Sequence, residues 1–167
     1  VGVADPGLTV HDIAERIVVG GWPTNLGLTP RQSLRYLSGY LDDICQVDIQ
    51  RVDDRRRDPD GVRRLIASLA RNTATPARIT TLTRDANGTD GTLAQETVSV
   101  YLKALGRLMV TDDVLAWDPG IRSTVRLQGA TVRHLADPSL ATAALGAGTD
   151  RVIREIAWMG LLFESLV

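Results

Sequence analysis

The chain has 167 residues, a formal net charge of −1, 44% hydrophobic residues and 23% charged residues. These values are typical of a globular protein and exclude global disorder and a uniformly basic nucleic-acid-binding protein. The single cysteine, Cys45, excludes an internal disulfide and a cysteine-based zinc site, and it fits a reducing compartment. No segment approaches the roughly 20 apolar residues of a membrane span, so we expect a cytoplasmic protein without a membrane partner.

Residues 1–57 predict a pair of helices followed by a charged loop. Thr9 can cap a helix that runs to Gly20-Gly21, after which Trp22-Pro23 favours an extended exit. Thr29-Pro30 has the order of cap and first-turn proline that begins a second helix. The apolar residues of that helix recur at helical spacing and are Leu34, Leu37, Leu41, Ile44, Cys45 and Ile49.

Residues 58–117 have the element order of a winged helix. A helix, a shorter helix, a turn and a longer helix together make a helix-turn-helix core, and an extended segment follows it. The predicted elements are a helix from Asp60 to about Asn72, a short helix over 78–86, a helix at which Thr92 and Gln95 have capping-box spacing, and an extended segment over 109–117.

Residues 118–167 predict a linker with short strands, followed by two helices. The strands are expected at 125–127 and 132–136. Asp137 can cap a helix that begins at Pro138, and a last helix is expected from about Arg151 onward. The fold class is therefore mainly α with a small β element, a helical bundle around a winged-helix-like core.

Nucleic-acid binding is one functional reading of this core, because the last helix of such a core can enter the major groove of DNA. Residues 61–110 carry seven positive and three negative side chains, a net charge of +4. Glu96 opposes this reading, since DNA-reading helices favour Arg, Asn or Gln in their first turns. The side chains that would reach nucleic acid are Arg84, Gln95, Ser99, Lys103 and Arg107.

Several short motifs follow one another over nearly the whole chain. They are Gly20-Gly21-Trp22-Pro23, Tyr40-Leu41-Asp42-Asp43-Ile44, Glu96-Thr97-Val98, Arg133-His134-Leu135-Ala136-Asp137-Pro138 and Gly160-Leu161-Leu162-Phe163-Glu164. Their order and spacing resemble the C-terminal region, domain of unknown function 4143, of bacterial AAA-type P-loop ATP-binding proteins. We mark Gly20, Gly21, Trp22, Pro23, His134, Asp137, Pro138 and Glu164 as the family-motif residues.

The resemblance implies a longer parent protein, in which a P-loop ATPase module that binds ATP and magnesium precedes this segment. It also implies a nuclease-like module, of which residues 118–167 would hold the truncated start. The segment itself has no G-x-x-x-x-G-K-[ST] loop, so we expect no cofactor in it. Glu164 alone does not make a magnesium site, which needs several oxygen ligands. His134 and Asp137 could orient an imidazole for base catalysis, but a structural hydrogen bond is the favoured reading.

Two functions follow as expectations for this segment, neither of them catalytic and neither with a metal. In the first, the segment couples the ATPase and C-terminal modules of the parent through protein contacts, including contacts with further copies of the protein. In the alternative, the winged helix binds DNA or RNA for the nuclease-like module. We expect neither ATP hydrolysis nor DNA cleavage by the segment itself.

Overall fold

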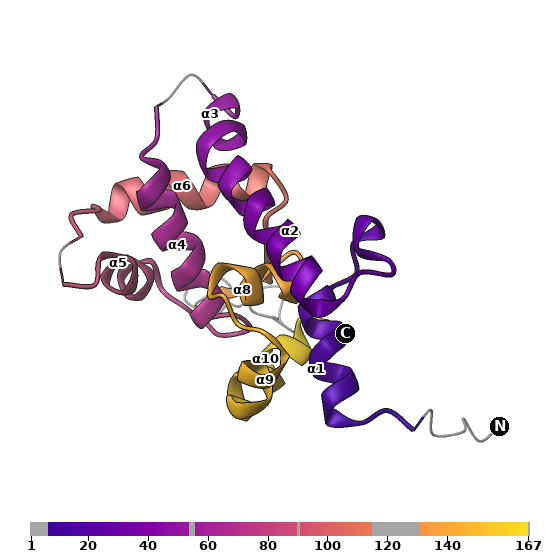
Figure 1. Cartoon of the computed structure of the whole chain (residues 1–167). Helices are drawn as coiled ribbons and strands as arrows, with labels where there is room; N and C mark the ends of the chain where they lie inside the picture. The colour runs from indigo at the N-terminus through magenta and orange to yellow at the C-terminus, as the bar shows by residue number, and fades with distance from the viewer. Residues whose placement is uncertain (1–6, 54–55, 90, 115–130, 167) are drawn as a thin grey trace, which may run out of the picture.

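The computed structural model describes residues 7–53, 56–89, 91–114 and 131–166 (Figure 1). This part of the chain is mainly helical and contains one small antiparallel sheet, as the sequence predicts. No helix within it is both long and apolar enough to cross a membrane. Its elements are α1 (Val10–Val19), η1 (Pro23–Asn25), α2 (Pro30–Asp43), η2 (Ile44–Asp48), α3 (Ile49–Arg51), α4 (Pro59–Arg71), α5 (Ile79–Asn87), α6 (Gln95–Arg107), β1 (Thr111–Val114), β2 (Val132–Leu135), α8 (Pro138–Ala144), α9 (Thr149–Arg154) and α10 (Ile156–Glu164).

The short helix α8 lies at the centre of the fold (Figure 1). All of its residues except the last, Ala144, are buried, and α1, α2 and α4 pack against it. Most α8 side chains are small, so the three surrounding helices can approach its backbone closely. The apolar interior that results is one cluster, to which these helices and the elements around them contribute.

The first two long helices begin at capping boxes, which confirms the predicted starts. The hydroxyl of Thr9 accepts a hydrogen bond from the backbone N–H of Asp12, whose carboxylate in turn accepts from the Thr9 backbone N–H. Thr29 and Gln32 repeat this arrangement at the start of α2. Each box satisfies donors that a helix start leaves without intrahelical partners.

The helix α2 continues through a π-helical turn, η2, into α3. The backbone N–H of Ile49 donates to the carbonyl of Ile44, five residues earlier. This wider turn accommodates one extra residue. As a result Ile44, Cys45 and Ile49 all reach the core, whereas Asp48 stays only half-buried.

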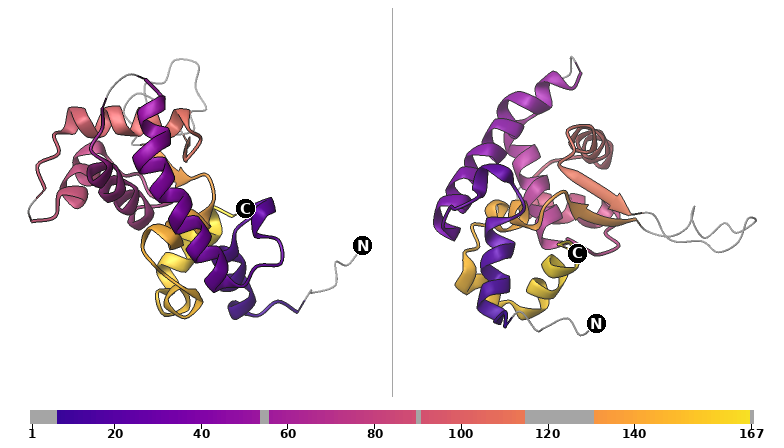
Figure 2. Two further views of the ribbon diagram at one scale, coloured as in Figure 1. Left: turned by 45° about the horizontal axis from the view of Figure 1, so that its top comes forward. Right: turned by 90° about the vertical axis from the view of Figure 1, so that its right-hand side faces the viewer.

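The helices α4, α5 and α6 pack in sequence and are followed by the sheet, which lies beside α6 (Figure 2). The strands β1 and β2 pair antiparallel, with Thr111 opposite Leu135 and Val114 opposite Val132. On the other side of β2, Thr75 forms an isolated antiparallel bridge with Arg133. The segment between α4 and α5 therefore also belongs to this small β element.

Two predicted helix starts are wrong in detail. Asp58, not Asp60, caps α4, because Pro59 occupies the first helical position and the Asp58 carboxylate accepts from the N–H groups of Asp60 and Gly61. The capping box at Thr92 does not form. Asn87 exchanges two hydrogen bonds with the backbone of Leu93, so that α6 begins only at Gln95.

The predicted last helix is divided at Glu155 into α9 and α10. Glu155 has φ −96° and ψ 57°, which interrupts the helical backbone. The predicted strand at 125–127 and the end of the extended segment, residues 115–117, lie outside the described residues, whereas β2 confirms the strand expected at 132–136.

We predict that Leu65→Ala lowers the free energy of unfolding by about 2–5 kcal/mol, because Leu65 is fully buried and its truncation leaves a cavity. Urea unfolding followed by circular dichroism measures the change. Leu26, which is 83% exposed, supplies the matched control, and Leu26→Ala should change stability by less than about 0.5 kcal/mol. Equal losses in the two variants would contradict this packing.

Candidate functional site

Asp137 connects the loop after α1 to the start of α8. Its Oδ2 accepts a hydrogen bond of 2.8 Å from the Gly21 backbone N–H. Its Oδ1 accepts from both the backbone N–H of Ser139, at 2.8 Å, and the Ser139 hydroxyl, at 2.5 Å. The indole N–H of Trp22 donates to the same hydroxyl at 3.1 Å. We call Gly20, Gly21, Trp22, Asp137 and Ser139 the loop clamp.

Gly20 is the position in the loop clamp that only glycine fits. Its φ is +73°, a left-handed value that side chains disfavour. An added Cβ would also lie 2.5 Å from Asp137 Oδ1 and 2.8 Å from Ser139 Cβ. Trp22 packs edge-on against Tyr40 of α2, with ring centroids 5.5 Å apart, and Pro23 begins η1. These motif residues thus serve the packing of the fold.

The remaining motif residues also hold structural positions. His134 Nδ1 lies 2.8 Å from the hydroxyl oxygen of Ser165, which joins β2 to the end of α10. The expected pairing of His134 with Asp137 is wrong: the His134 ring contacts Ser165, and the Asp137 oxygens accept hydrogen bonds from Gly21 and Ser139. Pro138 is the first residue of α8, and Glu164 is an exposed residue at the end of α10.

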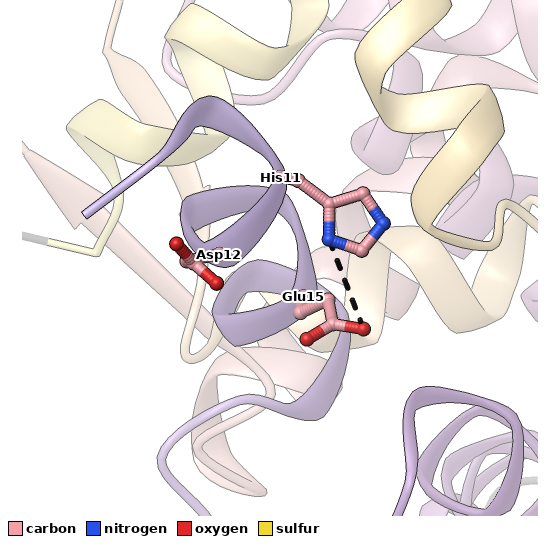
Figure 3. Close-up of side chains that lie close together, drawn as sticks. All are labelled: His11, Asp12 and Glu15. Atoms are coloured by element: carbon pink, nitrogen blue, oxygen red, sulfur yellow. Dashed lines mark ion pairs between the residues drawn. The ribbon is translucent and has the colours of Figure 1, made fainter.

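One group of possible metal ligands occurs within the described residues: His11, Asp12 and Glu15 in the first turns of α1 (Figure 3). His11 Nδ1 lies 4.0 Å from Glu15 Oε1; His11 is exposed, and Asp12 and Glu15 are half-buried. The Asp12 carboxylate already accepts from Thr9, whose hydroxyl hydrogen bond is the main reason that the pKa of Asp12 is lowered. We assign no metal to this group.

Cys45 is buried in η2 and carries no reactive thiolate. Burial raises the pKa of its thiol to about 11, so the group is protonated at neutral pH. The thiol therefore acts as a small apolar side chain of the core.

The predicted nucleic-acid-binding side chains lie on α5 and α6. Gln95, Lys103 and Arg107 are exposed, Ser99 is half-buried, and Arg84 is exposed on α5. Ser99 and Lys103 line one shallow groove of about 360 Å³ between α6 and the sheet. The same groove contains the ion pair of Arg133 with Asp113, which sequence reasoning did not identify because it forms only across the strand pair.

The surface of α10 was also missed by sequence reasoning. Its residues are almost all apolar, yet only Met159 and Leu162 are buried. Ile156 remains 63% exposed and Phe163 44% exposed. The helical spacing of Ile156, Gly160 and Phe163 could have indicated an apolar face, but not that this face lies in solvent.

A hollow of about 670 Å³ in the described surface lies between α4, α9 and α10. Three of its polar side chains have partners: Arg71 pairs with Asp85, Arg151 donates to the Leu145 carbonyl, and the Trp158 indole donates to the Ala70 carbonyl at 2.9 Å. The Trp158 hydrogen bond attaches α10 to α4, so this lining residue has a structural role.

A family model described as domain of unknown function DUF8612 matches residues 10–151. The chain belongs to this family. The resemblance to domain of unknown function 4143 is therefore wrong, and nothing in the match links this DUF8612 domain to AAA-type ATPases or to bacteria. No curated protein and no solved structure matches the chain significantly. Most of the fold, including the loop clamp and α6, lies within the matched residues, whereas α10 lies beyond them.

We predict that Gly20→Ala destabilises the protein more than Gly27→Ala does. Both glycines have positive φ, but only at Gly20 would a Cβ collide with other atoms. The backbone conformation costs about 1 kcal/mol in either variant. The collision at Gly20 adds roughly 1–3 kcal/mol. Urea unfolding of the two variants measures the difference, and equal destabilisation would show that the loop clamp is not closed in solution.

Proposed function

We propose that this chain is a protein-interaction module whose binding surface is the exposed apolar face of α10. The observation that carries the proposal is the exposure of Ile156 and Phe163 on a helix that is apolar around most of its circumference. A helix of this composition is ordinarily buried, because its apolar surface is unfavourable in water. A protein partner that covers this face would remove that surface from solvent.

The attachment of α10 to the rest of the fold supports this function. The Trp158 indole donates to the carbonyl of Ala70 in α4, and Ser165 contacts His134 of β2. The helix also packs beside α1 (Figure 2). A surface that is already held in place loses little conformational freedom on binding, which favours association.

The helices α4–α6 and the sheet form a winged-helix-like core in this proposal. Three helices precede an antiparallel strand pair, and Thr75, between the first two helices, bridges to Arg133 of β2. That order of elements supports the assignment, because a helix-turn-helix core followed by a hairpin is the pattern of a winged helix. In this proposal the core holds α10 in position through the contacts of α10 with α4 and β2.

Nucleic-acid binding by the α5–α6 surface is the second candidate. Within the described part of the chain, no carboxylate lies at ion-pair distance from Arg84, Lys103 or Arg107. Free cations of this kind can contact phosphates. Glu96 and Asp112, both exposed near the same surface, weaken the attraction, so this candidate ranks below protein binding.

The interaction module has no catalytic step and no cofactor of its own in this proposal. The motif carboxylate Asp137 is engaged in the loop clamp, and His134 contacts a hydroxyl that also donates to the Leu161 carbonyl. These contacts support structural roles for Asp137 and His134. A cytoplasmic location agrees with the single, buried cysteine.

We predict that a photo-activated cross-linking residue at position 163 traps a protein partner in the cells that produce this chain. The same residue at position 36 is the control, because Tyr36 is similarly exposed, at 49%, but lies on α2. The partner identified by mass spectrometry should disappear when Ile156→Glu is added, since a charge on this face opposes apolar docking. Equal products from positions 163 and 36, or products that survive Ile156→Glu, would remove α10 as the docking surface.

The second candidate predicts duplex binding that weakens as salt rises, with Lys103→Ala and Arg107→Ala each reducing the slope of log K against log salt by about 0.9. Fluorescence anisotropy with labelled duplex and single-stranded oligonucleotides measures this. Arg35→Ala, an exposed position on α2, should leave both affinity and slope unchanged. Absence of binding to either oligonucleotide at low salt would eliminate the candidate.

A further inference from the structure

We infer that α2 and η2 carry a second docking surface, which binds arginine side chains of a basic segment in a partner protein. Three aromatic residues, Trp22, Tyr36 and Tyr40, and two carboxylates, Asp43 and Asp48, form this surface. We call these five residues the aromatic surface. It is separate from the apolar face of α10 and therefore goes beyond the proposed function.

Three aromatic rings lie together on one side of α2. The whole chain has three Trp, three Tyr and one Phe, so three rings at one place are a concentration of a scarce residue type. Tyr36 and Tyr40 are four positions apart and project from the same side of the helix. Trp22, in the loop beside α2 (Figure 1), contacts Tyr40 edge-on with ring centroids 5.5 Å apart. Tyr36 is 49% exposed and the other two are half-buried, so the rings are open to a partner.

The π-helical turn brings a carboxylate to these rings. In an uninterrupted α-helix, Asp48 would lie on the side of Leu41 and Ile44, seven and four positions earlier, which are both buried. The extra residue in η2 turns Asp48 away from that side. Its charge instead reaches Tyr40. Burial raises the pKa of the Tyr40 hydroxyl, and the negative charges of Asp48 and of ionised Tyr36 raise it further.

The carboxylates make this surface complementary to a cation. Asp43 lies three positions after Tyr40, is exposed, and has no ion pair within the part of the chain that the structure describes. Asp48 pairs with Arg51, but the distance between nitrogen and oxygen is 3.9 Å and the Arg51 side chain is 76% exposed. So exposed a pair contributes little to stability, and an incoming guanidinium can therefore displace Arg51.

Arginine is the cation that fits both the rings and the carboxylates. Its planar guanidinium stacks on aromatic faces, and its N–H groups donate to carboxylates in pairs, whereas a lysine ammonium is a point charge. The Trp22 ring is already held by its hydrogen bond to Ser139 and by Tyr40, so it loses little freedom on binding. Each contact at an exposed site is weak, so binding needs several arginines in one segment.

NMR titration of the whole chain with an arginine-rich glycine–serine peptide tests the inference. We expect shifts of the Trp22 indole signal and of the Tyr36 and Tyr40 amide signals, with a dissociation constant on the order of 1 mM. The same peptide with citrulline in place of arginine keeps the shape but lacks the charge, and it should not bind. A lysine version should bind about threefold more weakly, because it lacks the planar fork.

Substitutions in the aromatic surface should change this affinity in both directions. Tyr36→Ala should weaken binding about two- to fivefold, and Asp48→Asn should do so in low salt and less in high salt. Arg51→Ala should strengthen binding about twofold, because it removes the competing cation. Glu96→Gln is the matched control, since it removes an exposed carboxylate on α6 and should leave the affinity unchanged. Circular dichroism checks that every variant is folded.

Equal affinity for the arginine and citrulline peptides would overturn the inference, and so would the absence of binding up to about 10 mM peptide. Affinity that Tyr36→Ala and Asp48→Asn leave unchanged would overturn it as well. Equal affinity for the arginine and lysine peptides would refute arginine as the preferred side chain.

The aromatic surface and the apolar face of α10 can be tested apart. Binding of the arginine peptide should survive Ile156→Glu, which disturbs only α10. A cross-link from position 36 should involve a protein different from the one captured at position 163. Loss of peptide binding in Ile156→Glu would place the arginine site on α10 and overturn the inference.

Discussion

The packing of three helices on α8 is the constraint on which the rest of the fold depends. A helix at the centre of so small a protein must have small side chains, and α8 carries Ser139, Ala141, Thr142 and Ala143 in buried positions. Its two buried hydroxyl residues have partners: Ser139 with Asp137, and Thr142 with the Ser139 carbonyl. Because these hydroxyls find partners within α8 and its N-cap residue, they do not need hydrogen-bond partners from the surrounding helices.

The loop clamp connects this central helix to the surfaces proposed for binding. Asp137 fixes the end of α1 against the start of α8, and α1 in turn packs beside α9 and α10. The helix that carries the exposed apolar face, α10, is therefore connected through α1 to the central helix, whereas α6 packs against α5 and β1.

The structure explains why the motifs pointed to the wrong family. Gly20-Gly21-Trp22-Pro23 and Asp137-Pro138 are the two halves of the loop clamp, and each residue type there follows from a local packing requirement. A glycine at positive φ, an aspartate cap and a first-turn proline recur wherever a loop closes onto a helix start. Such motifs describe a structural junction, and the DUF8612 match over residues 10–151 identifies the family instead.

The sequence by itself determined the helices whose signals are local. Thr9, Thr29 and Asp137 cap helices where predicted, because a cap involves residues only two or three positions apart. The tertiary structure decided the rest. In the fold, Asp137 accepts hydrogen bonds from Gly21 and Ser139, and His134 contacts Ser165. One side of α10 remains exposed. Periodicity shows that a helix has an apolar face, but only the packing of distant elements determines whether that face is buried.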